Sequence, residues 1–410
     1  MKVLVSAYAC EPDKGSEPGV GWHWICEIAK NNEVWVCTKA NNRESIEREL
    51  DKNPNNHLHF IYVDLPKWLT FWKKGQQGVH AYYYLWQFAA LKHALTAHRD
   101  VNFDIGHHVT FVNAWLWTFL ALMPLPYIWG PIGTNSKMPP QLLRHTGERI
   151  RNSLRYNVQA FIRIMDPLYW ISALRASLIL VINRETQHIF PLYNLARRKI
   201  HIETAIGIEQ PNDIKKRKNN KLIIIFIGRF LLIKGIHLAM EAFAKFARKK
   251  NDVTFQIIGE GPLVKSLRDF VKSADLTDKV EFIHWMPRNS VLGFLQQADI
   301  FLFPTMEGAG MVVLEAMASG LPVVCLDFGG PSTMVDEKSG FRIKIKNYNE
   351  TIELLVQAMQ ILYENKDIRR KMGSSALKRV SERFTWNKKS QIINIYYNEI
   401  IDRQCRNDQP

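Results

Sequence analysis

Two cations and two carboxylates lie just after apolar runs in the second half of the chain. Arg229 and Lys234 follow one run, and Glu307 and Glu315 follow another. A guanidinium and an ammonium bind diphosphate, whereas carboxylates accept hydrogen bonds from vicinal hydroxyls. Each pair taken alone is also consistent with solvated surface charge. Because both pairs fall at the end of a predicted strand, we expect them to share one site.

The carboxylates belong to a predicted strand, loop, helix and strand unit. The apolar run 300–303 reads as a strand, 311–319 as a helix and 323–326 as the next strand. Ligands of open parallel sheets bind outside the carboxyl ends of the strands, where helix N-termini present free N–H groups. The backbone N–H groups of Gly310 and Met311 are therefore predicted to bind phosphate.

The cations belong to a second unit of the same kind. A buried strand ends at Gly228, and Lys234 stands immediately before Gly235 and a predicted helix over 236–248. Positive side chains beside a helix N-terminus form a clamp for a diphosphate.

These residues carry a resemblance to a known family. Gly228-Arg229 with Lys234-Gly235, the segment IIGEGP at 257–262, and Glu307 separated by seven residues from Glu315 resemble the family-4 retaining glycosyltransferases of glycosyl transferases group 1. The resemblance is close over residues 222–340 and covers the rest of the chain in outline. It implies an α/β protein of the GT-B type, with two Rossmann-like domains whose parallel sheets face each other across a cleft.

The resemblance also implies a role for each matching residue. Arg229 and Lys234 would hold the donor diphosphate and stabilise the leaving group. Glu307 would contact the transferred sugar, and Glu315 would bind the ribose hydroxyls.

Three further donor contacts follow from the resemblance. Gly259 and Gly261 would let their loop approach the nucleotide closely, since glycine has no Cβ. The backbone near Met286, in the segment FIHWM, would face the base.

The first domain is predicted to begin with a strand at 2–7, a glycine-rich loop and a helix over 19–30. This first strand-to-helix turn is where a Rossmann half approaches phosphate. By resemblance, Gly19 and Gly21 would face the donor. The surrounding block SEPGVGW resembles bacterial surface-polysaccharide members but departs from a plain Gly-Gly loop, which leaves the contacts of Glu17 open.

A predicted strand ends in His107 and His108. Neighbouring residues on a strand face opposite ways, so at least one imidazole is expected at the cleft floor, where it can bind a sugar hydroxyl or move a proton. The resemblance implies a histidine that contacts the donor sugar, and we favour His108 over His107. A structural histidine bonded to backbone is the alternative.

Two stretches of the first domain have the composition of a membrane surface. Arg144, Arg151 and Arg155 are compatible with one face of a basic amphipathic helix within 137–163, suited to anionic lipid or to a diphosphate-linked acceptor. The aromatic and lysine-rich stretch from Lys67 to Phe88 is the other. A solvated helix face and a core helix over 79–98 are the respective alternatives.

The composition of the chain argues against several other functional classes. The chain has 410 residues, 47% of them hydrophobic, a net charge of +15 and five scattered cysteines. The length suits two domains, and the charge favours acidic partners, although no nucleic-acid-binding motif accompanies it. The cysteines indicate a reducing cytoplasm, and no stretch reads as a convincing export signal or membrane span.

We expect the first domain at 1–210, a linker at 211–220, the donor domain at 221–384, and a terminal helix within 385–410 that crosses back to the first domain. The linker assignment rests on the polar, unpatterned sequence PNDIKKRKNN. The helical crossing is implied by the resemblance alone.

The expected function is transfer of a sugar, with retention, from a nucleotide diphosphate-sugar to a glycan or a polyprenyl-diphosphate-linked glycan at the cytoplasmic membrane face. No Asp-x-Asp pair occurs, so we expect no metal and no cofactor. The alternatives are a sugar-nucleotide epimerase and a non-catalytic nucleotide-sugar-binding assembly subunit. A phosphorylase would need a pyridoxal phosphate lysine, for which no signature stands out.

Overall fold

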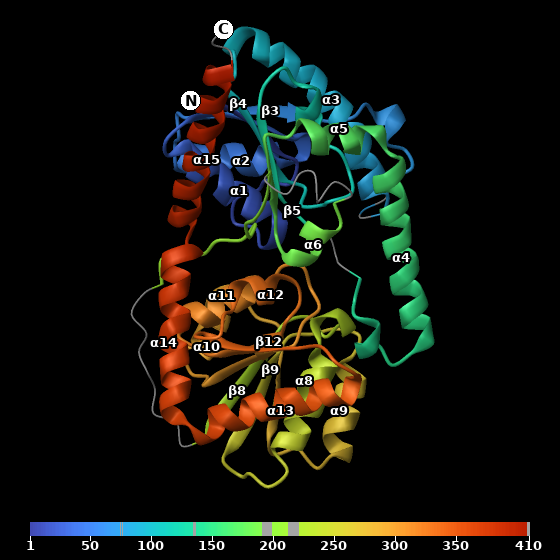
Figure 1. The fold of residues 1–410 in the computed structure, drawn as a ribbon, viewed down its shortest axis with the longest axis vertical. Coiled ribbons are helices and arrows are strands. Elements are labelled where there is room, and N and C mark those ends of the chain that lie inside the picture. The colour runs from blue at the N-terminus through green and yellow to red at the C-terminus, as the bar shows by residue number, and fades with distance from the viewer. Residues whose placement is uncertain (74, 76, 134–136, 191–198, 212–220, 408–410) are drawn as a thin grey trace. The chain divides into compact units, whose positions relative to one another are not determined.

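A computed structural model describes all residues except 74, 76, 134–136, 191–198, 212–220 and 408–410 (Figure 1). The chain divides into two compact units. Unit 1 comprises Met1–Thr134, Asn157–Ala205 and Trp386–Pro410, and unit 2 comprises Asn135–Tyr156 and Ile206–Thr385. The chain therefore passes from one unit to the other at four points, after residues 134, 156, 205 and 385.

Unit 1 is built on a seven-stranded parallel sheet of order β3-β2-β1-β4-β5-β6-β7. The strands are β1 (Lys2–Ala7), β2 (Glu33–Lys39), β3 (Leu58–Val63), β4 (Ile105–Thr110), β5 (Tyr127–Ile132), β6 (Leu178–Val181) and β7 (Ile200–Ile202). The connecting helices are α1 (Ser16–Ala29), α2 (Arg43–Lys52), α3 (Val79–Val101), α5 (Pro167–Arg175) and α6 (Arg184–His188). A further helix, α4 (Thr146–Met165), begins in unit 2 and continues in unit 1 after Tyr156. Parallel sheets need crossover helices of this kind, and these helices bury the faces of the sheet.

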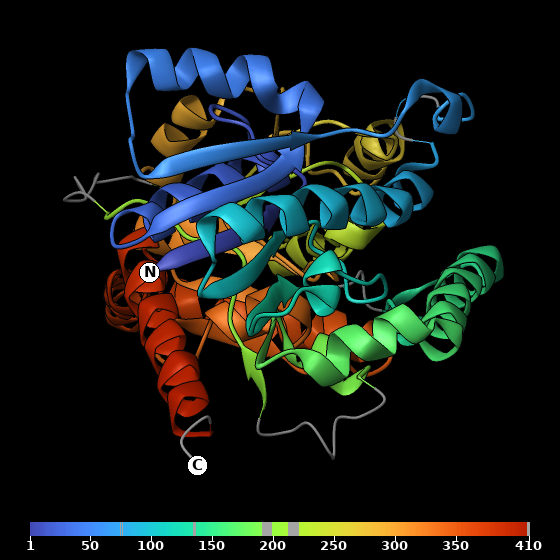
Figure 2. The same ribbon diagram turned by 90° about the horizontal axis from the view of Figure 1, so that it is seen from above.

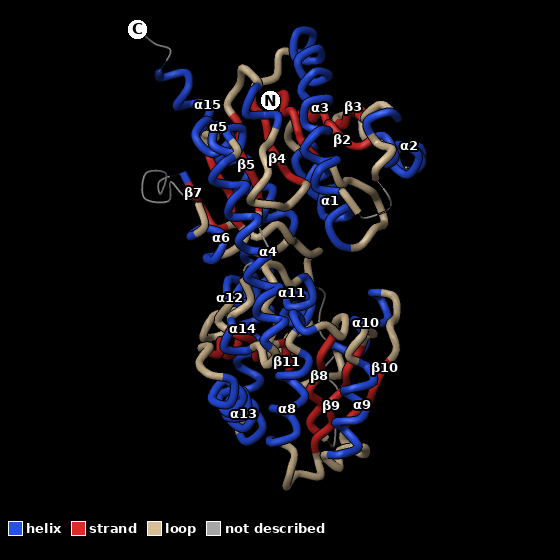
Figure 3. The backbone as a smooth tube through the Cα atoms, turned by 90° about the vertical axis from the view of Figure 1, so that its right-hand side faces the viewer, coloured by secondary structure: helices blue, strands red, loops and turns tan. Residues whose placement is uncertain are grey.

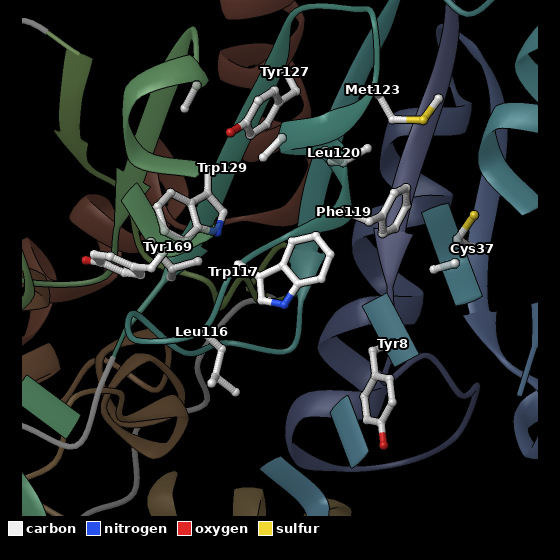
Figure 4. Close-up of a cluster of buried hydrophobic side chains, with 14 of the residues drawn as sticks. Tyr8, Cys37, Leu116, Trp117, Phe119, Leu120, Met123, Tyr127, Trp129 and Tyr169 are labelled. Carbon is white, nitrogen blue, oxygen red and sulfur yellow. The ribbon is translucent and has the colours of Figure 1, made fainter. Parts of the chain in front are cut away.

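Aromatic side chains fill much of the core of unit 1. Trp86, Trp117, Trp129 and Tyr169 are fully buried, and Figure 4 shows the last three with Phe119, Tyr127 and their neighbours. The predicted core helix is α3, which extends to Val101 and buries Tyr82, Tyr83 and Trp86. Part of the aromatic, lysine-rich stretch is exposed instead, with Trp68 at 72% and Phe71 at 81%.

The last helix, α15 (Trp386–Asn407), packs against α1 within unit 1. The Lys389 ammonium is fully buried and donates to the Glu203 carboxylate at 2.6 Å and to the Thr204 carbonyl at 2.6 Å. The Tyr397 hydroxyl lies 2.6 Å from His107 Nδ1 on β4. Several buried polar contacts thus fix the end of the chain to unit 1.

Unit 2 contains a six-stranded parallel sheet of order β10-β9-β8-β11-β12-β13. The strands are β8 (Leu222–Ile227), β9 (Val253–Ile258), β10 (Val280–Ile283), β11 (Ile300–Phe303), β12 (Val323–Leu326) and β13 (Gly340–Ile343). The helices are α8 (Ile236–Phe246), α9 (Val264–Ser273), α10 (Arg288–Leu295), α11 (Met311–Ala318), α12 (Gly329–Met334), α13 (Tyr348–Glu364) and α14 (Lys366–Arg383). Figure 3 shows the strands of this unit in red with helices in blue beside them.

Residues 135–156 were expected in the first domain but pack in unit 2. The Arg144 guanidinium lies 2.7 Å from a Glu241 carboxylate oxygen on α8 and 4.2 Å from the centre of the Tyr348 ring on α13. These contacts hold the segment to unit 2. The expected linker lies outside the described residues, apart from Pro211.

No helix among the described residues has the length and apolar character needed to cross a membrane.

Candidate active site

The strand order of unit 2 identifies the ligand-binding edge. β8 lies between β9 and β11, so the chain winds outward in opposite directions from β8. Ligands of open parallel sheets bind at such a switch point, outside the carboxyl ends of the two strands. The loop after β8 carries Arg229 and Lys234, and the loop after β11 carries Glu307.

Close backbone packing joins these two loops. Gly235 ends the first loop with φ +70°, and a Cβ there would lie 1.9 Å from the Pro304 carbonyl oxygen. Beside this contact, the Met306 N–H donates to the Ile233 carbonyl at 2.8 Å. Glycine is required at 235 both for its left-handed conformation and for the close approach.

This packing brings Lys234 to Glu307. The Lys234 Nζ lies 2.6 Å from Glu307 Oε2, and the two side chains remain 21% and 23% exposed. Partial burial strengthens the attraction relative to a surface pair while leaving both groups within reach of a ligand. The ammonium can thus meet a phosphate while the carboxylate accepts from a sugar hydroxyl.

The Glu307 loop is held on its other side by a glycine turn after β12. Gly330 N–H donates to the Glu307 carbonyl at 3.1 Å. Gly329 has φ +65°, and a Cβ there would lie 1.9 Å from the same oxygen. Sequence reasoning assigned these glycines no role, although a Gly-Gly-Pro turn directly after a buried strand was a usable signal.

Glu315, on α11, is buried at 8% exposure and has a partner that sequence reasoning missed. The Arg288 Nε donates to Glu315 Oε1 at 2.6 Å from the start of α10. The Arg288 side chain is 54% exposed and the Glu315 side chain 9%, so the arginine covers the carboxylate. The two predicted glutamates therefore pair with two different bases.

Arg229 lies two residues beyond the end of β8 and is exposed, and no ion pair joins it to an acid among the described residues. Gly259 and Gly261, beyond β9, pack against the Arg229 loop. A Cβ at Gly259 would lie 2.2 Å from the Gly228 carbonyl oxygen, and one at Gly261 would lie 2.7 Å from that of Phe230. The close packing of the protein's own backbone therefore requires glycine at both positions, and their approach to a nucleotide stays a prediction.

Gly310 and Met311 lie where the sequence predicted. α11 begins at Met311, and Gly310 at its N-cap supplies no side chain to occupy the free N–H groups. Met286 is half-buried between β10 and α10, at the carboxyl end of the sheet.

The predicted glycine-rich loop of unit 1 is largely helix. α1 starts at Ser16, three residues before the predicted start at Gly19, so Gly19 and Gly21 lie buried inside it. A Cβ at either position would lie within 2.1 Å of a carbonyl oxygen of the preceding loop, from Lys14 or Ala9. The two glycines therefore allow that loop to pack on the helix, and their contact with a donor stays a prediction.

Glu17, whose contacts the sequence left open, lies in the first turn of α1 and accepts a hydrogen bond from the Val112 N–H beyond β4. Burial raises the pKa of Glu17 to about 7. This carboxylate thus stands at the β1 and β4 switch point of unit 1.

Both predicted histidines are buried and engaged by the protein. His107 contacts Tyr397 Oη at 2.6 Å and the Gly130 carbonyl at 2.8 Å, and His108 contacts Thr118 Oγ1 and the Phe111 carbonyl, each at 3.2 Å. Burial lowers the pKa of His107 to about 3 and that of His108 to about 4. The expected imidazole open to a sugar is therefore corrected, because both faces of this parallel strand are covered.

The three predicted arginines do not share one helical face. α4 begins at Thr146, so Arg144 lies before it and pairs with Glu241 as described above. Arg151 is exposed on α4, whereas Arg155 is half-buried, with its guanidinium 3.4 Å from Asn152 Oδ1.

Comparison with known proteins agrees with this geometry. Residues 208–379 match the model of the family described as glycosyl transferases group 1, a span that covers most of unit 2 and the whole switch-point site. This part of the chain is similar to the glycosyl transferases of group 1. Two parallel Rossmann-like sheets in such a chain are the GT-B arrangement.

Similar group 1 proteins include enzymes of bacterial polysaccharides. The amylovoran biosynthesis glycosyltransferase AmsK of Erwinia amylovora is 31% identical over 39% of this chain and 41% of its own. The putative colanic acid biosynthesis glycosyltransferase WcaL of Escherichia coli K12 is 35% identical over 30% of this chain and 32% of its own. The chain spans about half the length of the first curated relatives it matches.

Solved structures extend the likeness of fold to both units. HepE of Anabaena in complex with UDP has a TM-score of 0.62 at 17% identity, covering 97% of this chain and 100% of its own. Sucrose-phosphate synthase of Thermosynechococcus elongatus has a TM-score of 0.64 at 15% identity, covering 98% and 99%.

Proposed function

We propose that this protein is a retaining, metal-independent glycosyltransferase that uses a nucleotide diphosphate-sugar. The observation that carries the proposal is the half-buried Lys234–Glu307 pair at the switch point of unit 2. The ammonium would bind the donor diphosphate and the carboxylate would orient the sugar. Solved structures of similar fold in complex with UDP, such as HepE of Anabaena and the pneumococcal O-GlcNAc transferase GtfA, support the choice of donor class.

In the proposed reaction an acceptor hydroxyl oxygen attacks the anomeric carbon on the face from which the phosphate departs. The bond between that carbon and the phosphate oxygen breaks, and the hydroxyl proton passes to the departing phosphate. Lys234, Arg229 and the N-terminus of α11 would stabilise the developing negative charge. Because protein cations and backbone dipoles can supply this stabilisation, and because the chain has no Asp-x-Asp pair, we propose that no divalent metal is needed.

The proposed acceptor is a glycan, carried on polyprenyl diphosphate, in cell-surface polysaccharide synthesis at the cytoplasmic membrane face. Support comes from the similarity to AmsK, an amylovoran biosynthesis glycosyltransferase, and to WcaL, a putative colanic acid biosynthesis glycosyltransferase.

The test begins with a thermal-shift screen of nucleotide sugars, since a ligand raises stability with the logarithm of its excess over Kd. With the donor found, Lys234→Ala is expected to lower kcat roughly 100- to 1000-fold, as for loss of one transition-state donor. EDTA should leave the rate unchanged, and NMR should show the anomeric configuration of the donor retained in the product.

Lys245→Ala is the matched control, because Lys245 forms an ion pair with Glu353 elsewhere in unit 2. It should retain wild-type kcat. Loss of activity in EDTA would overturn metal independence, and an inverted product would overturn retention. An altered sugar formed without acceptor would instead identify an epimerase.

A further inference from the structure

α4 carries a stripe of large apolar side chains exposed to solvent. Each of the six is between 50% and 64% exposed. They are Ile150, Leu154, Val158, Phe161, Ile164 and Met165. At about 100° per residue, these positions fall within an arc of roughly 120° on the helix surface. Solvated helix faces do not normally collect such side chains, so this stripe indicates a surface that is covered in the working protein.

The opposite side of α4 is anchored by polar contacts. Asn152 is buried and exchanges hydrogen bonds with the Met138 backbone at 3.1 and 2.9 Å. Arg163 is also buried. Just after the helix, Asp166 caps α5 and lies 3.3 Å from Tyr84 Oη. Figure 2 shows α5 and α4 as successive green helices. The buried polar side chains therefore lie on one face of α4 and the exposed apolar stripe on the opposite face.

The charge of α4 indicates what covers the apolar stripe. The helix carries Arg149, Arg151, Arg155 and Arg163 against the single acid Glu148. Arg151 and Arg155 fall beside the stripe on the helical wheel. A second copy of the chain would bring the same positive flank to the contact and repel it, whereas anionic lipid headgroups would be attracted. The whole chain has the same sign, with a net charge of +15.

We propose that α4 is an in-plane membrane anchor that inserts this stripe into the interface of an anionic bilayer. Residues 150–165 span roughly 22 Å, enough for the helix to lie along the surface with its apolar side chains at the acyl boundary. The proposal deepens the membrane part of the proposed function by naming the surface and the lipid class. It concerns binding alone, so its test does not use the transfer reaction.

The test is sedimentation with sucrose-loaded vesicles of phosphatidylcholine, with and without 30 mol% phosphatidylglycerol as a working composition (about one anionic lipid in three). Wild type is expected to pellet with the anionic vesicles and to be released by salt. The double variant Phe161→Asp with Met165→Asp should lower the partition coefficient on the order of 100-fold, because two apolar side chains no longer insert. Both positions are exposed, so folding should persist, and circular dichroism would verify it.

Ile395→Asp is the matched control, since Ile395 is 55% exposed on α15, and it should bind vesicles like wild type. Equal pelleting of wild type and the α4 double variant would overturn the proposal. So would loss of binding only in Trp68→Ala with Phe71→Ala, which would move the anchor to that exposed pair. A wild-type dimer that the double variant dissociates, without vesicle binding, would assign the stripe to self-association instead.

Discussion

Single side chains of unit 2 are positioned by pairing with opposite charges. Lys234 and Glu307 are about equally accessible, so an incoming ligand can engage either one. Glu315 lies beneath an exposed Arg288, so any ligand that reaches this carboxylate must do so beside the guanidinium. Sequence reasoning identified both glutamates because they follow a buried strand, but it gave no partner for Glu315. Arg288 lies 27 residues earlier, and no periodic pattern links residues on different helices.

At this scale we expect Arg288→Ala to lower the free energy of unfolding by about 1 to 3 kcal/mol, because it leaves a buried carboxylate without its partner. The donor KM should rise more than kcat falls if Glu315 positions the ribose. Urea titration and steady-state kinetics would measure both effects. Arg403→Ala, which removes an exposed helix pair with Glu399, should change stability by no more than about 0.5 kcal/mol. A Glu315 site indifferent to Arg288→Ala would contradict the covering role.

The apolar pattern of the sequence predicts the strands and helices closely, but it does not predict the loops between them. Both β1 and β12 have the predicted bounds, because each is a short apolar run that ends at a clear break. The helix expected at 19–30 begins at Ser16 instead, since glycine in a helix interior obscures the start signal. The pattern of two adjacent histidines on a strand does not predict that both faces of the strand are buried. The partners of the two histidines are Tyr397, which lies far along the chain, and Thr118, which lies outside β4.

The loop between β8 and α8 gives a prediction at the level of elements. Gly235→Ala would place a Cβ against the Pro304 carbonyl in a left-handed conformation, and both loops of the site would have to move. We expect a loss of about 2 kcal/mol or more in stability and a fall in kcat of at least ~100-fold from the displaced Lys234.

Gly293→Ala is the comparison for that variant. Gly293 lies within α10 with open space around its α-carbon, so alanine should be neutral or stabilising by up to ~1 kcal/mol. If both glycine variants behaved alike in denaturant titration and turnover, the packing argument at Gly235 would fail.

In unit 1, buried titratable groups have opposite effects on stability as the pH falls. His107 and His108 are held neutral, with pKa values of about 3 and 4, below the ordinary value of 6.5. Their contribution to stability is therefore lost as pH falls below about 6.5, by about 5 kcal/mol in total between pH 7 and 4.5. Glu17 acts in the other sense, because its pKa of about 7 lies above the ordinary 4.5, so its contribution is present at low pH and lost as pH rises through 7.

We therefore expect Glu17→Gln to make unit 1 more sensitive to acid. The variant keeps an oxygen that can accept from Val112 N–H but cannot gain the proton that offsets the histidines. Relative to wild type, its free energy of unfolding should fall by roughly 2 to 3 kcal/mol more between pH 7 and 4.5. Tryptophan fluorescence in urea suits the measurement, because Trp285 is the only one of twelve tryptophans in unit 2. Identical pH profiles for the two proteins would rule out the raised pKa.

The chain passes between its two units four times, and this affects where two related chains can be joined to make a hybrid. A chimera made by joining two relatives at residue 206 would combine most of unit 2 from one parent with the 135–156 segment of the other. Arg144 would then meet a foreign residue at position 241, and α15 would come from a parent that did not supply α1. Hybrids intended to exchange unit 2 should therefore carry residues 135–156 together with 206–385, and should keep the terminal helix of the parent that supplies unit 1.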